Sequence, residues 1–339
     1  MNSLFGKTIF SILAVSLFAA ATLISYSQPA KPDSRHLPVA SPRPPEMPRR
    51  IGGDTSERSI VVDRNVTISL CVTQGNLKIN GWNRNEVRVF VKDGAKFSFN
   101  VLQKSLNSES PGWIKIVGME PKGKYGPQSD CIWGDEIEID APVGSIINMT
   151  GTETTTTIDG VKKVLVKTLG GDISLRNITN GINAAAGQGD ISVDESQGTV
   201  ILDTTTGNIV VFEAGPSEIG NFFKARTNSG TVSLQGLQHR QVDVSSTSGS
   251  VIYDGEILSG GTYNLSTVKG SIKMSIPANS SCQIIAFYGY GNFNSELPLK
   301  IETEDKYEGP TRRVVGKLGT GGATVKLTSN NGSILIKKR

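Results

Sequence analysis

Two acidic residues occupy matching positions in consecutive copies of a short motif, and their spacing is the first in this sequence that could carry chemistry. Asp172 follows a glycine in Gly-Asp-Ile-Ser-Leu, and Asp190 follows one in Gly-Asp-Ile-Ser-Val. If the motifs form neighbouring strands, the two carboxylates lie about 5 Å apart. Such a pair could flank a sugar bond or contribute to a calcium site. The next copies carry Asn208 and Thr231 instead of acids, so we predict a solvent-exposed edge rather than either site.

Residue types that often carry catalysis or bind metals are scarce elsewhere. The chain has two histidines, His36 and His239, and no Gly-x-Ser-x-Gly motif, which argues against a nucleophilic triad. Its three cysteines form no Cys-x-x-Cys pair and have no histidine close in sequence, which argues against zinc. We therefore predict no catalytic residue, no cofactor and no metal site.

Two of the cysteines enclose an irregular, glycine-rich insertion. Cys71 lies in a β-patterned segment, Cys131 opens another, and the insertion covers Phe97 to Cys131. In an oxidising compartment these two cysteines could form a disulfide. The alternative is that all three cysteines are small buried apolar residues. Cys282 has no partner nearby in sequence, so we expect it to be buried and free.

The glycine motif recurs through the second half of the chain, which predicts the architecture. Each copy combines a glycine, a small polar residue and alternating aliphatic residues, and a second short apolar segment lies between copies. The copies begin at Gly171, Gly189, Gly207, Gly230, Gly249, Gly270, Gly291 and Gly332. Repeats of about 18–23 residues predict an all-β fold, a β-solenoid or β-helix-like stack of two-strand coils. Because side chains alternate along a strand, Ile173, Ile191 and Ile209 should form one inward column.

The segments before the repeats differ in composition. Residues 1–27 contain Lys7, the uncharged run Thr8–Ile24 and a small-x-small site at Ser25–Ser27, which together predict a secretory signal peptide. An uncleaved membrane anchor through residues 8–24 is the alternative. Residues 28–58 are rich in proline and predict a disordered linker. We expect an N-terminal β-capping region with the insertion at 59–142, and the solenoid at 143–339.

Aromatic residues gather in two places. All three tryptophans lie within residues 82–133, and Tyr288 and Tyr290 lie in the aromatic segment Ala286–Phe293. The simpler interpretation is that both groups cover the ends of the solenoid. The alternative is a ligand surface that includes Trp113, Tyr288 and Tyr290, because aromatic side chains offer flat apolar faces with polar edges.

The repeats resemble the bacterial putative-adhesin domain family, a domain of unknown function with Gly-Asp-Ile-x-Val repeats. The resemblance rests on these motifs, on VTQGNLKINGWNRNEVRV (72–89), on IPANSSCQIIAFYGYGNFNSELPLKI (276–301) and on GKLGTGGATVKLTSNNGSILIKK (316–338). It covers Ser59 to the end of the sequence and implies a β-solenoid with an adhesin-like role. It supplies no catalytic or ligand-binding residues. The insertion is longer than the compact opening region that the family leads us to expect.

The charge pattern limits the class of partner. The formal net charge is +4, with acidic and basic residues interspersed, whereas nucleic-acid binders concentrate basic residues on one face. We predict a non-catalytic exported protein in the periplasm, on the cell surface or in the medium, either free or anchored at its N-terminus. Its Ser/Thr/Asn-rich surface would bind a glycan or a protein, for adhesion, scaffolding or sensing. The alternative is a polysaccharide-active β-helix enzyme, a lyase or a glycoside hydrolase.

Overall fold

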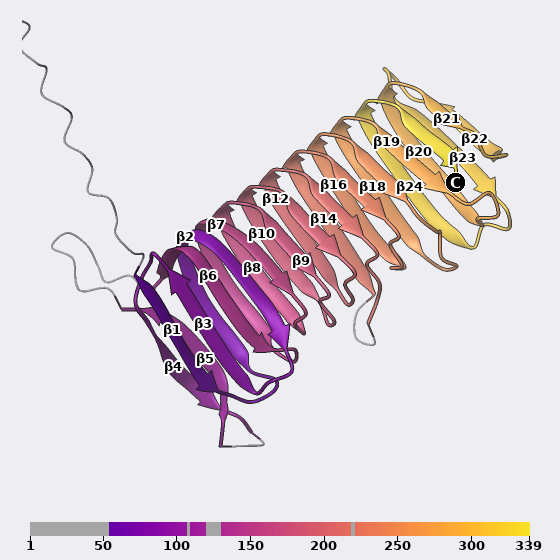
Figure 1. The fold of residues 1–339 in the computed structure, drawn as a ribbon. Coiled ribbons are helices and arrows are strands. Elements are labelled where there is room, and N and C mark those ends of the chain that lie inside the picture. Colours follow the sequence, from indigo (N-terminus) through magenta and orange to yellow (C-terminus); the bar gives the residue numbers. More distant parts are fainter. Residues whose placement is uncertain (1–53, 107–108, 120–129, 218–220) are drawn as a thin grey trace, which may run out of the picture. The chain divides into compact units, whose positions relative to one another are not determined.

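The computed structural model describes residues 54–106, 109–119, 130–217 and 221–339 (Figure 1). These residues hold 25 strands joined by hydrogen bonds and contain no helix, hence none that could cross a membrane. The all-β solenoid prediction is confirmed. The expected signal peptide and all but the end of the expected linker lie outside the described residues. The first strand, β1 (Thr55–Val61), includes the last residues of the range assigned to that linker.

The strands form two faces, A and B, and each face runs along the length of the stack (Figure 1). Most coils place one strand in each face, and equivalent strands of successive coils pair in parallel. In spatial order, face A consists of β4 (Phe97–Lys104), β5 (Pro111–Gly118), the first half of β2 (Thr67–Trp82), the first half of β7 (Ile146–Asp159), β8 (Lys163–Gly170), β10 (Ile182–Gln188), β12 (Val200–Thr206), β14 (Phe222–Ser229), β16 (Gln241–Ser248), β18 (Thr262–Lys269), β24 (Ala323–Asn331), β20 (Cys282–Tyr290), β23 (Arg312–Leu318) and β22 (Lys300–Lys306). Face B consists of β1, β3 (Glu86–Lys92), β6 (Ile132–Pro142), the second halves of β2 and β7, β9 (Ile173–Arg176), β11 (Ile191–Asp194), β13 (Ile209–Phe212), β15 (Val232–Gln235), β17 (Val251–Asp254), β19 (Ile272–Ile276), β25 (Ile334–Lys338) and β21 (Phe293–Ser295).

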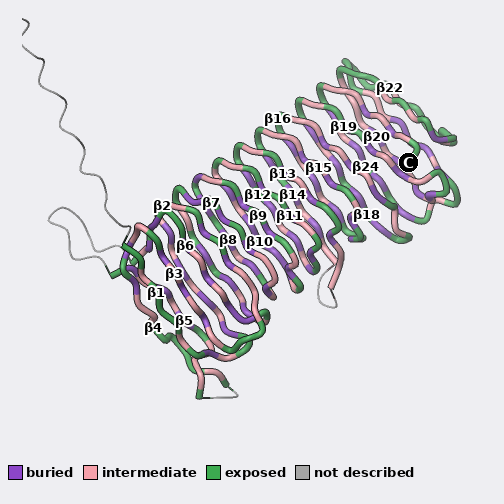
Figure 2. Tube along the Cα trace, viewed as in Figure 1, coloured by how far each residue is buried: buried purple, intermediate pink, exposed green. Residues whose placement is uncertain are grey.

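The core is a set of aliphatic columns between the two faces. Ile191 pairs with Ile173 on one side and with Ile209 on the other, and all three side chains are buried. The predicted inward column is therefore confirmed. Figure 2 shows the same alternation of buried and exposed positions along the strands of both faces. Burying a side chain of this size contributes about 2–3 kcal/mol, so repetition of the column stabilises coils that could not fold alone.

The inner surface also carries a column of Ser and Thr hydroxyl groups just before most of the motif glycines. Thr204 Oγ1 donates to the carbonyl of Gly189 in the preceding coil (3.0 Å), and Thr227 Oγ1 donates to that of Gly207 (2.9 Å). Equivalent bonds run from Ser246 to Gly230, from Thr267 to Gly249 and from Ser329 to Gly270. These hydroxyls hold neighbouring coils together where the chain passes from face A to face B.

The motif glycines are required because successive coils touch at that corner. Gly207 and Gly230 have φ angles of 153° and 154°. A Cβ atom at either position would collide with the carbonyl oxygen of the motif glycine one coil before. Any side chain there would push the coils apart.

The N-terminal region continues the stack. The long strands β2 and β7 pass through both faces, and the insertion forms a β4–β5 hairpin whose β5 pairs in parallel with β2. Phe97, Ile114 and Ile116 belong to the same hydrophobic cluster as the solenoid residues. The buried residues of the capping region therefore pack in the same core as those of the solenoid. The expected boundary at 142–143 lies between β6 and β7, and both of those strands pair with β2.

At the C-terminal end the coils do not follow the order of the sequence. β24 pairs with β18 on one side and with β20 on the other, and β25 pairs with β19 and β21 in the same way. The coil formed by residues 323–338 is thus inserted between two coils that precede it in sequence. The antiparallel strands β23 and β22 extend face A beyond β20.

Candidate functional site

The carboxylates of the acidic pair, Asp172 and Asp190, accept hydrogen bonds from backbone N–H groups. The N–H of Asp190 donates to Oδ1 of Asp172 (2.8 Å), and the N–H of Asn208 donates to Oδ1 of Asp190 (2.7 Å). Each carboxylate therefore accepts a hydrogen bond from the next coil. This geometry explains why an acceptor side chain follows the motif glycine, a role that the sequence interpretation missed.

The same contact continues through later coils with uncharged side chains. Asn208 Oδ1 accepts from the N–H of Thr231 (2.9 Å), and Ser250 Oγ accepts from the N–H of Ser271 (3.3 Å). Ser271 Oγ in turn accepts from the N–H of Ser333 (3.2 Å). Aspartate, asparagine and serine are interchangeable here because each has a short side chain with an acceptor oxygen. We refer to this series of side chain-to-backbone contacts as the corner ladder.

No metal-binding cluster is found within the described ranges: they contain no group of three or more His, Cys, Asp or Glu residues placed to hold an ion. His239 is fully buried, and its Nε2 lies 2.7 Å from the carbonyl of Gly198, whereas its Nδ1 has no partner. Burial lowers the pKa of His239. The ring therefore acts as a neutral hydrogen-bond donor within the stack.

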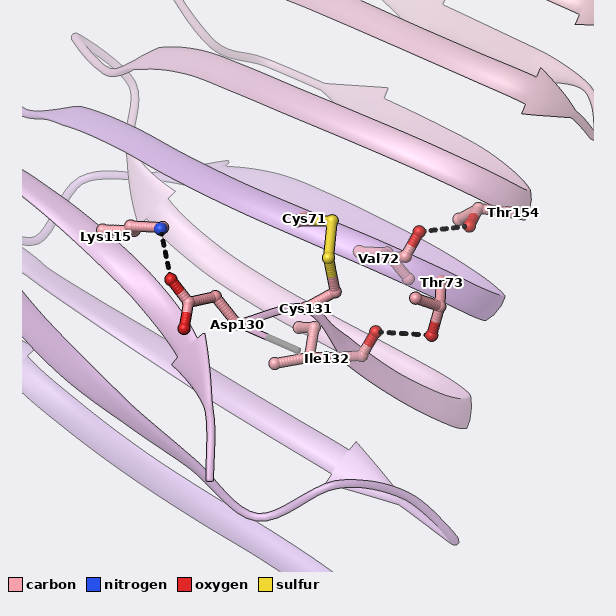
Figure 3. The surroundings of a disulfide bond; sticks show 8 residues. All are labelled: Cys71, Val72, Thr73, Lys115, Asp130, Cys131, Ile132 and Thr154. Atoms are coloured by element: carbon pink, nitrogen blue, oxygen red, sulfur yellow. Dashed lines mark hydrogen bonds and ion pairs between the residues drawn. A yellow bond between two sulfur atoms is a disulfide. The ribbon is translucent and has the colours of Figure 1, made fainter. Parts of the chain in front are cut away.

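The structure joins Cys71 and Cys131 in a disulfide (Figure 3), with Cα atoms 4.5 Å apart. The bond links β2 to the residue before β6, where the chain returns from the insertion. Nearby, Lys115 pairs with Asp130 (2.9 Å). Cys282 is free and buried, and burial raises the pKa of its thiol to about 11.

The aromatic residues proposed as ligand contacts do not come together. Trp113 lies on β5, is 40% exposed and donates from Nε1 to Ser69 Oγ (2.9 Å). Tyr288 and Tyr290 lie on β20 near the opposite end of the stack (Figure 1). Tyr288 stacks on Phe293, whereas Tyr290 is 69% exposed beside a shallow hollow of about 280 Å³. One ligand cannot contact both groups unless it spans most of the coils.

A larger hollow of about 430 Å³ lies over the turns of the N-terminal coils. Its lining comprises Arg64, Asn65, Trp82, Asn83, Arg84, Asn85, Pro142, Val143, Gly144, Lys162, Thr179 and Asn180. We call it the turn groove. The sequence interpretation missed it because its basic residues come from separate turns and form no local motif. Asparagine adjoins an arginine in two of these turns, at Arg64–Asn65 and at Asn83–Asn85, and this was a weak local signal.

Comparison with solved structures finds three proteins of low sequence identity. A putative cell adhesion protein from Clostridium sporogenes ATCC 15579 is 12% identical, with 85% of this chain and 100% of that chain covered and a TM-score of 0.28. A putative adhesin from Bacteroides fragilis NCTC 9343 is 13% identical (84% and 97% covered, TM-score 0.33). A putative lipid binding protein from Parabacteroides distasonis ATCC 8503 is also 13% identical (84% and 98% covered, TM-score 0.34).

Comparison with curated protein sequences finds no match. The family model described as Toastrack DUF4097 matches residues 55–337, which is nearly all of the described part of the chain. Its span includes both the insertion and the coil that is inserted at the C-terminal end. The chain therefore belongs to the Toastrack DUF4097 family.

Proposed function

We propose that this protein is exported to the bacterial envelope, where its solenoid binds a glycan or a protein without catalysing a reaction. The basic start and uncharged run of residues 1–27 support export. The proline-rich segment that follows would hold the solenoid away from the membrane or wall. Adhesion, scaffolding and sensing all fit this arrangement.

The observation that carries the proposal is the corner ladder. A β-helix enzyme that cleaves polysaccharides needs carboxylates free to act on a sugar bond or hold a metal. Asp172 and Asp190 are the acidic residues that follow the motif glycine in consecutive coils, and both accept backbone hydrogen bonds from the next coil. A carboxylate used in this way stabilises the stack and is poorly placed to transfer a proton.

The test is incubation of the purified protein with a panel of glycans and peptidoglycan, measuring both binding and product release. Binding of a panel member without turnover is the expected result. Release of reducing ends or of unsaturated sugars would refute the non-catalytic role and favour the alternative lyase or glycoside hydrolase. Mass measurement of the protein recovered from the envelope separates a cleaved signal peptide from an uncleaved anchor.

A further inference from the structure

The turn groove is lined by basic residues, and the nearby carboxylate of Asp63 accepts a hydrogen bond from the N–H of Asn65 (2.9 Å). Arg64, Arg84 and Lys162 line the groove, and its lining includes no aspartate or glutamate. None of the three forms an ion pair with another residue in the described part of the chain. Gathering like charges in one hollow is unfavourable unless an anion joins them.

Several other arginines on the strands of the stack are paired. Arg88 contacts Asp140, Arg176 contacts Glu195 (3.2 Å), and Arg313 contacts Asp305 (3.0 Å). Arg58 on β1 and Arg312 on β23 form no ion pair with another described residue either. What distinguishes the groove is that three such basic side chains line one hollow, which indicates a site for an anion.

The walls of the groove are held in place by the fold. The guanidinium of Arg84 lies 5.0 Å from the ring centre of Trp82, whose Nε1 donates to the carbonyl of Glu86 (2.7 Å). The N–H of Asn180 donates to the carbonyl of Lys162 (2.7 Å), which links the turns of adjacent coils. Arg84 and the backbone of these turns are therefore held in place before a ligand binds, which favours affinity.

Tight packing also fixes the floor of the groove. A Cβ atom at Gly144 would lie 2.8 Å from Oδ1 of Asn65 and would collide with the carbonyl of Arg64. The glycine lets the β6–β7 turn approach the β1–β2 turn closely. Arg64 and Asn65 are positioned by this approach.

The remaining polar groups identify the kind of anion. Asn65, Asn83 and Asn85 each offer an amide donor and an amide acceptor, and Asn180 adds an amide donor while its Oδ1 accepts from Ser217 (3.4 Å); such groups suit neighbouring hydroxyls. Arginine suits a carboxylate or a phosphate because it can donate two parallel hydrogen bonds. The volume falls within the range of small-molecule sites, roughly 300–1,000 Å³. We propose that the turn groove binds an acidic sugar, a saccharide unit that carries a carboxylate or a phosphate; this deepens the binding role proposed above and rests on it.

The experiment is isothermal titration of the full chain with galacturonic acid, glucose 6-phosphate, neutral galactose and inorganic phosphate. At least one acidic sugar should bind about tenfold or more tightly than galactose and inorganic phosphate, and its affinity should fall as salt rises. Binding by glucose 6-phosphate alone identifies the phosphate form, and binding by galacturonic acid alone identifies the carboxylate form. Equal binding of inorganic phosphate would overturn the assignment to a sugar, and failure of both acidic sugars to bind would overturn the proposal.

Variants of two groove residues test whether the acidic sugar binds in the turn groove. Arg64→Gln and Arg84→Gln should each weaken binding of the acidic sugar about tenfold, the loss of one charge-assisted hydrogen bond. The matched control is Lys273→Gln, which removes the same charge from an exposed position on β19 and should leave affinity unchanged. Equal affinities in all three variants would refute the assignment of the sugar to the turn groove while leaving the proposed binding function intact. Turnover of the sugar would refute the proposed non-catalytic function, and the variants would still report where the sugar binds.

Discussion

Removing the disulfide between Cys71 and Cys131 should weaken the N-terminal coils selectively. The two residues are 60 positions apart, and closing a loop of that length in the unfolded chain stabilises the folded state by about 4 kcal/mol. The double variant Cys71→Ser/Cys131→Ser removes this constraint. With a urea m-value of about 2 kcal/mol/M, the unfolding midpoint of the coils around the bridge should fall by about 2 M.

Tryptophan fluorescence measures this effect locally because all three tryptophans lie within residues 82–133. Far-UV circular dichroism reports on the whole β stack, so its later part should change less. Dithiothreitol should reproduce the shift in the unsubstituted protein and have no effect on the double variant. Cys282 does not complicate the result, because burial keeps its thiol protonated and unreactive. Identical fluorescence midpoints with and without reductant, or three alkylated thiols in the exported protein, would refute the reasoning.

Three further changes test single contacts by urea unfolding. Ala186 is buried at a position of the hydroxyl column but has no hydroxyl. In Ala186→Thr the new hydroxyl should donate to the carbonyl of Gly171, so the free energy of unfolding should exceed that of Ala186→Val by about 1 kcal/mol. Equal free energies of unfolding would contradict this. Glu213 has a φ of 49°, and the equivalent residue of the next coil is Gly236 with a φ of 69°. Because glycine adopts a positive φ without strain, Glu213→Gly should raise the free energy of unfolding by about 1 kcal/mol, whereas Glu213→Ala should not. A lower free energy of unfolding in Glu213→Gly would contradict backbone strain at this position. Burial lowers the pKa of His239, so above about pH 6.5 both states are neutral there and its contribution is constant. Below that pH the unfolded state takes up the proton first, and stability should fall by up to about 1.4 kcal/mol per pH unit until the lowered folded pKa is reached; the variant His239→Gln should lack this component, and an unchanged pH profile would refute it.

The features that could be predicted from the sequence are those encoded within one repeat. Alternating residues around Ile173 and Ile191 predict an inward column because every coil repeats the same pattern at the same distance from its glycine. The corner ladder was missed because it depends on the backbone of the next coil, so Asp172 and Asp190 were predicted to form a solvent-exposed edge with no structural role. The turn groove was also missed, since Arg64 and Lys162 come close only after the turns of different coils are stacked. Contacts between repeats require the register of stacking, which one repeat does not specify.

The C-terminal coils show why repeat identity does not determine stacking order. The inserted coil at 323–338 keeps every device of the motif: an added Cβ at Gly332 would collide with Gly270, and the N–H of Ser333 donates to Ser271 Oγ. The coil at its far side repeats the contact, because the N–H of Asn292 donates to Ser333 Oγ (3.3 Å). The motif therefore allows this coil to pack between two coils that precede it in sequence, and the connection between coils decides which ones meet. Here the β22–β23 hairpin lies beyond β20 and returns the chain to the position beside β18, so β20 pairs with β24 of the inserted coil and not with β18 within the described residues.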